Sequence, residues 1–248
     1  GERGGCDGEG RGGGIPYDAV SFDIGSTARG FLTTPGASEH AIPTRPISDL
    51  VRRIDEAERA LADELNSGKR TEAKVVVIGG GAAGIELAMA MRARFGRLFP
   101  PSDNDDDDGR RPERLTVTLL DSGEELLPSE TARCKRALLD ALSRRGIAVR
   151  FRSSVLEMTS DEIVLNDGGN GGGGDGGDDD RVPYTHCIWA AGAASHPLAD
   201  ASMRGRGVAV TERGWISVNP TLQSVSHPSI FAAGDCAEIE GLGDGSSG

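Results

Sequence analysis

The sequence predicts an α/β fold built around a doubly wound parallel sheet, with a small antiparallel layer of strands beside it. A continuous run of apolar residues at 74–78 has the composition of a buried parallel strand. It leads directly into the glycine-rich turn 79–84, and a helical pattern follows over 84–98. Strand, helix and strand patterns then alternate up to residue 151, which is the order of a parallel sheet with crossover helices.

The segment before this unit contains a strand and a long helix. Residues 17–26 form a strand that runs into a glycine turn. A helix follows from Pro46, because proline lacks only an N–H that the first helical turn leaves unused. Its apolar residues recur with helical spacing, at Ile47, Leu50, Val51, Ile54, Ala57, Leu61 and Leu65.

The elements after the turn continue the alternation and then change character. Strands are expected at 115–120 and 147–151, on either side of a helix over 129–145 that Gly146 ends. Short strands at 154–158 and 162–165 indicate the antiparallel layer, joined by a tight turn. Three more strands are expected, at 187–192, 215–219 and 229–235.

Composition limits the classes of function. The 248 residues carry a net charge of −12, which argues against a nucleic-acid partner or an anionic membrane because phosphates would be repelled. No apolar run reaches the roughly 18 residues of a membrane span. Glycine and acidic residues concentrate in a tail and two inserts that cannot bury apolar surface, so we expect them to be disordered. These segments are 1–14, 100–112 and 166–181.

Metal and dithiol chemistry find no support in the sequence. The four cysteines lack C-x-x-C spacing, and the four histidines lack metal-ligand spacing. The aspartate-rich inserts do not match a calcium loop. We therefore expect isolated thiols and no metal site.

The turn at 79–84 fits G-x-G-x-x-G between a strand and a helix, which is the context that dinucleotide binding requires. Gly79 makes the tight turn, Gly81 lets the backbone approach a pyrophosphate, and Gly84 lets the helix pack close to the strand. The N–H groups at the helix start, at Ala82 and Ala83, face the phosphates.

An acidic residue at the end of the second strand completes this pattern. Asp121 occupies that position, and the insert at 100–112 accounts for most of its extra distance along the chain. A carboxylate there accepts hydrogen bonds from ribose hydroxyls and repels a 2′-phosphate, which favours NADH over NADPH. A loop cap or a helix-start charge is the structural alternative for Asp121.

Three further motifs surround the turn in a fixed order. They are YDAVSFDIGST (17–27), HCIWAAGAAS (186–195) and GWISVNPTLQSVSHPSIFAAGDCAE (214–238). Together they resemble the pyridine nucleotide-disulfide oxidoreductase superfamily, flavoproteins with two dinucleotide-binding domains. Two branches are most similar: type II NADH dehydrogenases with ferroptosis-suppressor-like quinone reductases, and the flavoprotein domain fused to selenide, water dikinase.

The resemblance implies that a Rossmann-like NAD domain is inserted into a partial FAD domain. The first turn of the FAD domain and the C-terminal interface domain are not found, so we expect a fragment that is inactive alone. The implied segments are 1–14 as a tail, 15–40 and 214–248 as parts of the FAD domain, and 41–213 as the NAD(H) domain.

The resemblance also implies roles for individual residues. Glu86 would act near the junction of nicotinamide and flavin, and its alternative is a favourable carboxylate in the first helical turn. Gly192 would let a turn approach NAD. Asp235 would accept a hydrogen bond from FAD ahead of a helix that faces the pyrophosphate, or would simply cap that helix. Gly25, Ser26 and Gly234 complete the expected FAD-binding set.

The implied activity is hydride transfer from NAD(H), or less favourably NADP(H), to FAD and on to a small-molecule acceptor such as a quinone. A flavoprotein module of a selenide, water dikinase fusion and a non-catalytic nucleotide-binding regulatory domain stay open as alternatives. Membrane contact is expected only through regions outside this chain, and the oligomeric state is left open. The compartment is also open, with an intracellular and organellar location, in mitochondrion or plastid, compatible with the family.

Overall fold

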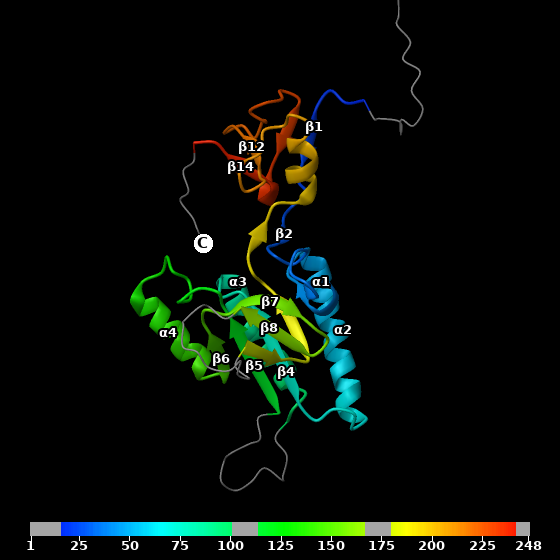
Figure 1. The fold of residues 1–248 in the computed structure, drawn as a ribbon, viewed down its shortest axis with the longest axis vertical. Coiled ribbons are helices and arrows are strands. Elements are labelled where there is room, and N and C mark those ends of the chain that lie inside the picture. Colours follow the sequence, from blue (N-terminus) through cyan, green and yellow to red (C-terminus); the bar gives the residue numbers. More distant parts are fainter. Residues whose placement is uncertain (1–15, 101–113, 167–179, 242–248) are drawn as a thin grey trace, which may run out of the picture. The chain divides into compact units, whose positions relative to one another are not determined.

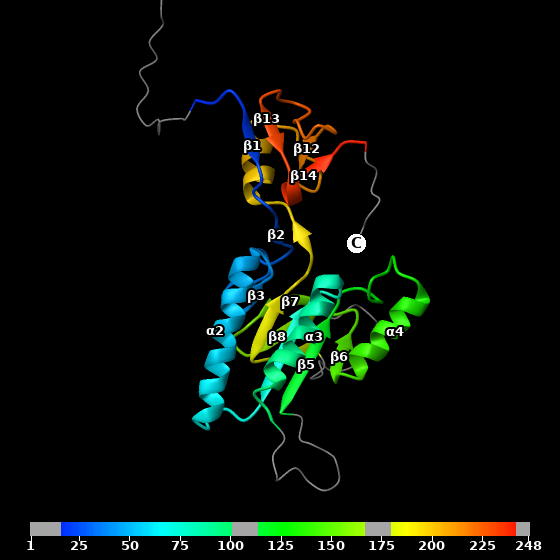
Figure 2. The same ribbon diagram turned by 180° about the vertical axis from the view of Figure 1, so that it is seen from behind.

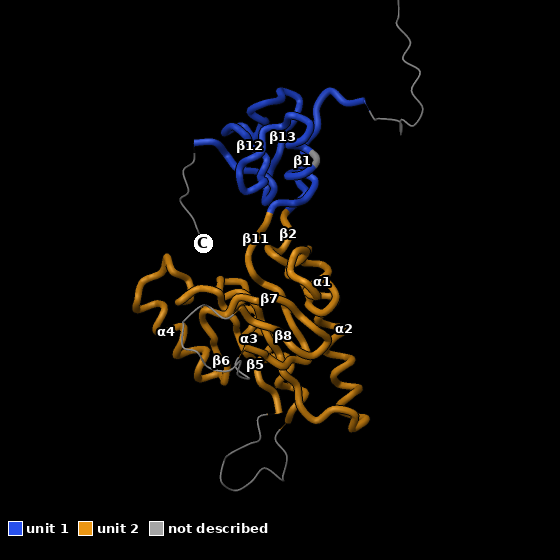
Figure 3. Tube along the Cα trace, viewed as in Figure 1, with its two compact units in different colours: residues 1–25, 195–243 blue, residues 26–194, 244–248 orange. Residues whose placement is uncertain are grey.

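The computed structural model describes residues 16–100, 114–166 and 180–241 (Figure 1). The chain forms two compact units: unit 1 contains 1–25 and 195–243, and unit 2 contains 26–194 and 244–248 (Figure 3). The glycine-rich tail and most of both acidic inserts lie outside the described residues, so their disorder stays a prediction.

Unit 2 is organised around a five-stranded parallel sheet, which confirms the predicted fold class. Its strand order is β3-β10-β4-β5-β6, with every neighbouring pair parallel. The strands are β3 (Ile42–Pro43), β4 (Ala73–Ile78), β5 (Leu115–Leu120), β6 (Ile147–Arg150) and β10 (His186–Trp189), and the longer helices are α2 (Ile47–Asn66), α3 (Ala82–Gly96) and α4 (Ala132–Ser143).

The two faces of this sheet are covered by different layers. Alternate residues of β4 point to opposite faces, as the pleat of a strand requires. Val75 and Val77 pack with the three long helices. Val76 and Ile78 pack with the antiparallel layer. The antiparallel layer lies in front of the sheet in Figure 1, and α3 lies in front of it in the view from behind (Figure 2).

The antiparallel layer contains one strand more than the sequence predicts. The predicted pair is present as β7 (Ser154–Met158) and β8 (Glu162–Asn166). A third strand, β9 (Arg181–Pro183), pairs with β8 and begins where the second acidic insert was expected to end. Buried Ile163 and Val182 face the sheet core, so their apolar side chains fix these strands in place.

Helix bounds differ from the prediction by one to three residues. Helix α4 begins at Ala132 rather than 129, because Thr131 caps it by accepting a hydrogen bond from the Cys134 N–H at 3.3 Å. In α2 the buried residues are Leu50, Ile54 and Leu61. Two residues assigned to the apolar face by spacing, Ile47 and Val51, are 69% and 53% exposed.

The units divide at different places from the expected domain boundaries at 40/41 and 213/214. Strand β2 (Thr27–Ala28) pairs with β11 (Ala193–Ala194) inside unit 2, and Ala37 is fully buried in its second core. The π-helical turn Leu198–Met203 instead packs Ala199 into the core of unit 1. These contacts place the divisions at 25/26 and 194/195. The expected domain boundaries and the assignment of cofactors to the domains stay predictions.

Unit 1 has a small core of its own. Strand β1 (Val20–Phe22) pairs in parallel with β13 (Ile230–Ala232), and β12 (Ile216–Val218) pairs in parallel with β14 (Ala237–Ile239). The buried side chains of these strands form one cluster, and Cys236, which is fully buried, packs in the same cluster.

The prediction of a helix after Asp235 is wrong for the part of the chain that the structure describes. A three-residue 3-10 helix, Gly234–Cys236, leads directly into β14. The segment extends because β14 completes the parallel pair with β12, which satisfies backbone groups that a helix would have bonded internally.

His186 lies at the start of β10, where the sheet meets α3. Its ring packs edge-on against Phe95 at 5.3 Å between centroids, and its Nδ1 lies 2.8 Å from Thr185 Oγ1. The pKa of His186 is lowered to about 4, chiefly because burial disfavours the charged ring and also because Arg70 repels it, while Glu64 acts in the opposite direction. The ring is therefore neutral at physiological pH.

This burial predicts a pH-dependent stability. Between pH 6.5 and about 4 the unfolded chain binds a proton at His186 that the folded chain does not, so stability falls as the pH falls. We expect a loss of about 2 kcal/mol for a partly shielded imidazole. Urea unfolding from pH 7 to pH 5 should show a shallower decline for His186→Gln than for wild type. The exposed His40→Gln serves as control, and equal slopes in all three proteins would contradict the prediction.

Candidate dinucleotide site

The sheet order brings the predicted NAD-binding residues together at the carboxyl ends of the parallel strands. The chain runs from β4 outward through β5 to β6, and later returns on the other side of β4 as β10. This reversal of direction is the position at which open α/β sheets bind ligands, at the carboxyl ends of the strands. The turn after β4, Asp121 after β5 and Gly192 after β10 all follow strand ends at this edge.

Two glycines of the turn are required by direct backbone packing. Gly79 has φ +111°, and a Cβ placed on it would lie 2.3 Å from the carbonyl oxygen of Ala190. A Cβ on Gly84 would lie 1.8 Å from the carbonyl oxygen of Gly79. Helix α3 can therefore begin directly above the strand only because both positions lack a side chain.

The other end of the turn is open to solvent. A Cβ on Gly81 would meet no atom within 4 Å, and Gly81, Ala82 and Ala83 are all exposed. Gly81 is the N-cap of α3 and no side chain caps this helix. The first N–H groups of α3 are thus directed to a space that a phosphate could fill.

Asp121 lies against the turn. A Cβ on Gly80 would lie 2.5 Å from Asp121 Oδ2, and a Cβ on Gly123 would lie 3.4 Å from the same oxygen. The carboxylate is therefore held between two glycines, beside the turn rather than away from it. Gly80 was not singled out from the sequence, because its fingerprint position accepts any residue and only the packing of Asp121 makes it small.

Glu86 and Gly192 complete the unit 2 residues. Helix α3 begins at Ala82, two residues earlier than predicted, so Glu86 lies beyond the first turn, which holds no acidic residue. The helix-dipole alternative for Glu86 is thereby weakened. Its side chain is exposed and pairs with no side chain in the described part of the chain. Gly192 has φ +89° and open space around it.

The predicted FAD-binding residues fall in unit 1 or at its boundary. Gly25 and Ser26 stand on the two sides of the division between the units. Gly234 has φ +67°, and a Cβ there would lie 2.8 Å from Asp23 Oδ1. Asp235 is exposed in the 3-10 helix that follows β13. The parallel pairing of β1 and β13 brings Asp23 and Gly234 together at the strand ends.

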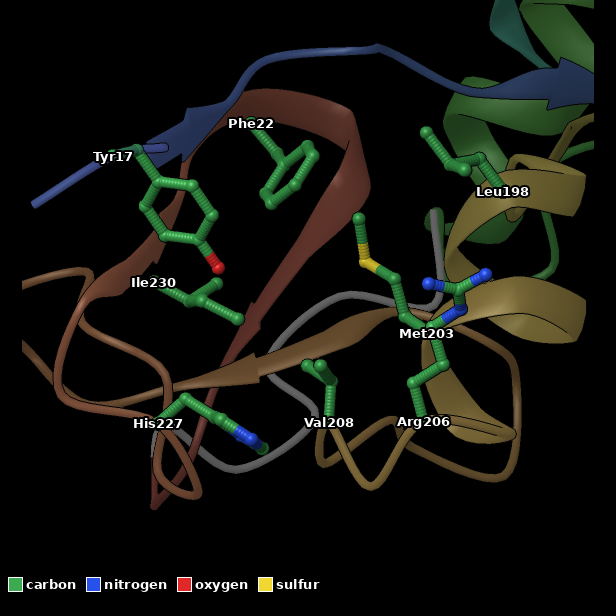
Figure 4. A pocket seen from close by; sticks show the side chains of 8 residues that line it. All are labelled: Tyr17, Phe22, Leu198, Met203, Arg206, Val208, His227 and Ile230. Carbon is green, nitrogen blue, oxygen red and sulfur yellow. The ribbon is translucent and has the colours of Figure 1, made fainter. Parts of the chain in front are cut away.

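A separate cavity of about 510 Å³ opens in unit 1, and none of the predicted site residues line it. Figure 4 shows mostly apolar side chains around it, with His227 and Arg206 at opposite sides of the view. The other lining residues are Tyr17, Phe22, Leu198, Met203, Val208 and Ile230.

Two ion pairs border the Asp121 turn. Arg152 donates to Glu124 at 2.9 Å and Lys135 donates to Glu125 at 2.7 Å. Neither pair was predicted, because the partners are separated in sequence and meet only in the folded sheet. Within the described residues no group of three His, Cys, Asp or Glu side chains is arranged to hold a metal ion.

A glycine turn at the switch point of a parallel sheet, with an aspartate one strand away, defines a dinucleotide-binding α/β protein. The sequence model of the pyridine nucleotide-disulphide oxidoreductases matches residues 4–246, and the chain belongs to this family of oxidoreductases.

Curated relatives include several NADH dehydrogenases. The chain is 28% identical to a probable NADH dehydrogenase of Dictyostelium discoideum, over 91% of this chain and 47% of that protein. It is 25% identical to the type II NADH:quinone oxidoreductase of Haemophilus influenzae, over 91% of this chain and 50% of that protein. An external alternative NAD(P)H-ubiquinone oxidoreductase, B2, mitochondrial, of Arabidopsis thaliana is 26% identical over 91% and 37%. The chain thus spans about half or less of these relatives.

Solved structures share the fold. The NDH2 of Plasmodium falciparum in complex with NADH superposes with a TM-score of 0.69 at 18% identity, covering 91% of this chain and 45% of that one. The water-forming NADH oxidase of Lactobacillus brevis bound to NADH gives 0.63 at 20% identity, covering 90% and 40%.

The glycine packing predicts a contrast between two alanine variants. Gly84→Ala would drive a Cβ into the Gly79 carbonyl and should cost about 3 kcal/mol of unfolding free energy. Gly81→Ala meets open space at φ −72° and should cost less than about 1 kcal/mol. Chemical denaturation of the two variants beside wild type measures both values. Equal losses would contradict the packing argument.

Proposed function

We propose that this chain is the NADH-binding part, with a portion of the FAD-binding part, of an FAD-dependent NAD(P)H oxidoreductase that passes electrons to a quinone. The observation that carries the proposal is the placement of Asp121 against the open glycine turn at the switch point of the sheet. Membership of the oxidoreductase family supports the same reading.

The residues of unit 2 fit a dinucleotide. The pyrophosphate would lie at the exposed start of α3, where the N–H groups of Ala82 and Ala83 and the positive end of the helix dipole favour negative charge. Gly81 leaves the space that the phosphates need. Asp121 would accept hydrogen bonds from the adenosine ribose, and Gly192 would let the backbone pass close to the nicotinamide half.

FAD would be held by Gly25, Gly234 and Asp235 of unit 1, with Ser26 as the next residue along the chain after Gly25. When bound, the nicotinamide supplies a hydride and the flavin accepts it. Glu86 would orient the nicotinamide carboxamide or adjust the electrostatics around the flavin. Its carboxylate is exposed and has no side-chain partner among the residues that the structure describes, so it can take either role.

A quinone is the acceptor that the relatives favour. The names of the Haemophilus influenzae and Arabidopsis thaliana proteins specify quinone or ubiquinone, and a third relative, of Synechocystis, is named a demethylphylloquinone reductase. None of the described helices has both the length and the apolar character of a membrane span. A mitochondrial or plastid location would accord with such relatives.

The relatives lend no support to the flavoprotein module of a selenide, water dikinase. The alternative function, a regulatory domain that binds a nucleotide without turnover, leads to a different expected result. Such a domain would bind NADH but would not reduce flavin when joined to the rest of its FAD domain.

The first test is NADH binding by the chain itself. We expect weak but saturable binding, detected by NADH fluorescence. Asp121→Asn keeps the packing against Gly80 but removes the charge, so affinity should fall about five- to tenfold through the loss of a charge-assisted hydrogen bond. Asp140→Asn, an exposed α4 residue, is the matched control and should bind as wild type. A chain that binds no NADH would overturn the proposal.

Glu86 can be tested in the full-length enzyme. Glu86→Gln should slow flavin reduction by NADH about tenfold or more, with NADH affinity changed less than about threefold, because the side chain is exposed beside the site and unneeded for folding. Stopped-flow absorbance of the flavin measures the rate. An unchanged rate would remove Glu86 from the reaction and leave it as a surface carboxylate.

A further inference from the structure

The turn after β5 and the end of β6 are tied together around Asp121. The Asp121 N–H donates to the Arg150 carbonyl at 2.9 Å, and the Ser153 N–H donates to the Asp121 carbonyl at 2.8 Å. The Arg152 N–H donates to the Gly123 carbonyl at 2.9 Å. Gly123 also lies beside the Asp121 carboxylate. The backbone of Arg152 is therefore hydrogen-bonded to a direct neighbour of that carboxylate.

Arg152 itself has an unusual backbone. Its φ of +53° is in the left-handed region, which costs a non-glycine residue on the order of 1 kcal/mol and tends to occur at ligand sites. Its side chain is 65% exposed and donates to Glu124 Oε1 at 2.9 Å. An exposed pair of this kind is weak, so the guanidinium can exchange partners.

We propose that Glu124 is a selectivity determinant of the dinucleotide site, because it occupies Arg152 and thereby withholds that cation from the 2′-phosphate of NADPH. The inference rests on the proposed function and deepens it. An arginine near the ribose is the group that accommodates a 2′-phosphate in dinucleotide-binding sheets, where an acidic residue favours NADH.

The charges decide the preference. Asp121 and Glu124 contribute two negative charges and Arg152 one positive charge, so a 2′-phosphate meets a net repulsion. Removing the Glu124 charge leaves one negative and one positive charge, so the net repulsion disappears. It also leaves the guanidinium of Arg152 free for a bidentate contact with the phosphate. NADH has no phosphate at this position, so its affinity should depend little on the pair.

The neighbouring pair provides a built-in comparison. Lys135 donates both to Glu125 at 2.7 Å and to the Pro128 carbonyl at 2.9 Å, and its side chain is only 16% exposed. It is therefore held inside the turn and cannot reorient as Arg152 can. Glu125→Gln removes the same charge from the same turn without releasing a mobile cation.

The test measures Kd for NADPH and NADH with the purified chain and four variants, at low salt and at 0.5 M salt. Glu124→Gln should bind NADPH about fivefold more tightly at low salt and NADH within about twofold of wild type. Glu125→Gln should change NADPH affinity less than about twofold. Arg152→Gln should not bind NADPH more tightly, and the Glu124→Gln/Arg152→Gln double variant should lose the gain of the single variant. The gain should shrink at high salt.

Each outcome separates the two proposals. Failure of wild type to bind NADH would overturn the proposed function and this inference with it. NADH binding with no NADPH gain in Glu124→Gln would overturn the inference alone. An equal gain in Glu125→Gln, or a gain that survives in the double variant, would show that general repulsion rather than Arg152 sets the selectivity, and would overturn it as well.

Discussion

The site depends on one steric constraint, the contact of the Gly79–Gly84 turn with its own backbone and with the Ala190 carbonyl. A protein interior is packed too densely to admit a methyl group at either glycine without displacing β10 or α3. This close approach sets where α3 begins, and the start of α3 in turn sets which N–H groups face solvent. Gly80 extends the same constraint to the neighbouring strand, because its lack of a side chain admits the Asp121 carboxylate.

The local charges beside the glycine turn differ from the overall charge of the chain. The chain carries a net charge of −12, yet basic groups stand beside the turn in Arg152 and Lys135. One is exposed and loosely paired, and the other is enclosed and bonded twice. The difference in mobility between two similar ion pairs gives them different consequences for an incoming phosphate, although their charges are the same.

The two units reflect how the chain divides its apolar residues among separate cores. The parallel sheet of unit 2 has one core under its helices and another under its antiparallel layer, while unit 1 gathers a third around four short strands. Short segments such as Thr27–Ala28 and Ala193–Ala194 are strands because they pair with each other, although neither has the hydrophobic pattern of a strand. The chain spans about half or less of the length of its reported relatives.

The sequence by itself determined the parallel sheet, the position of the glycine turn and the identity of Asp121. Those features rest on local signals: the continuous apolar strand 74–78, glycine where φ is positive, and a carboxylate at a strand end. It did not determine β9, the extension of the chain after Asp235, the exposure of Ile47 and Val51, or the unit boundaries. Each of these depends on which segment lies alongside, such as β8 beside β9 and β12 beside β14. Tertiary structure alone also placed Arg152 beside Asp121, because backbone hydrogen bonds between two parallel strand ends join residues that the sequence separates.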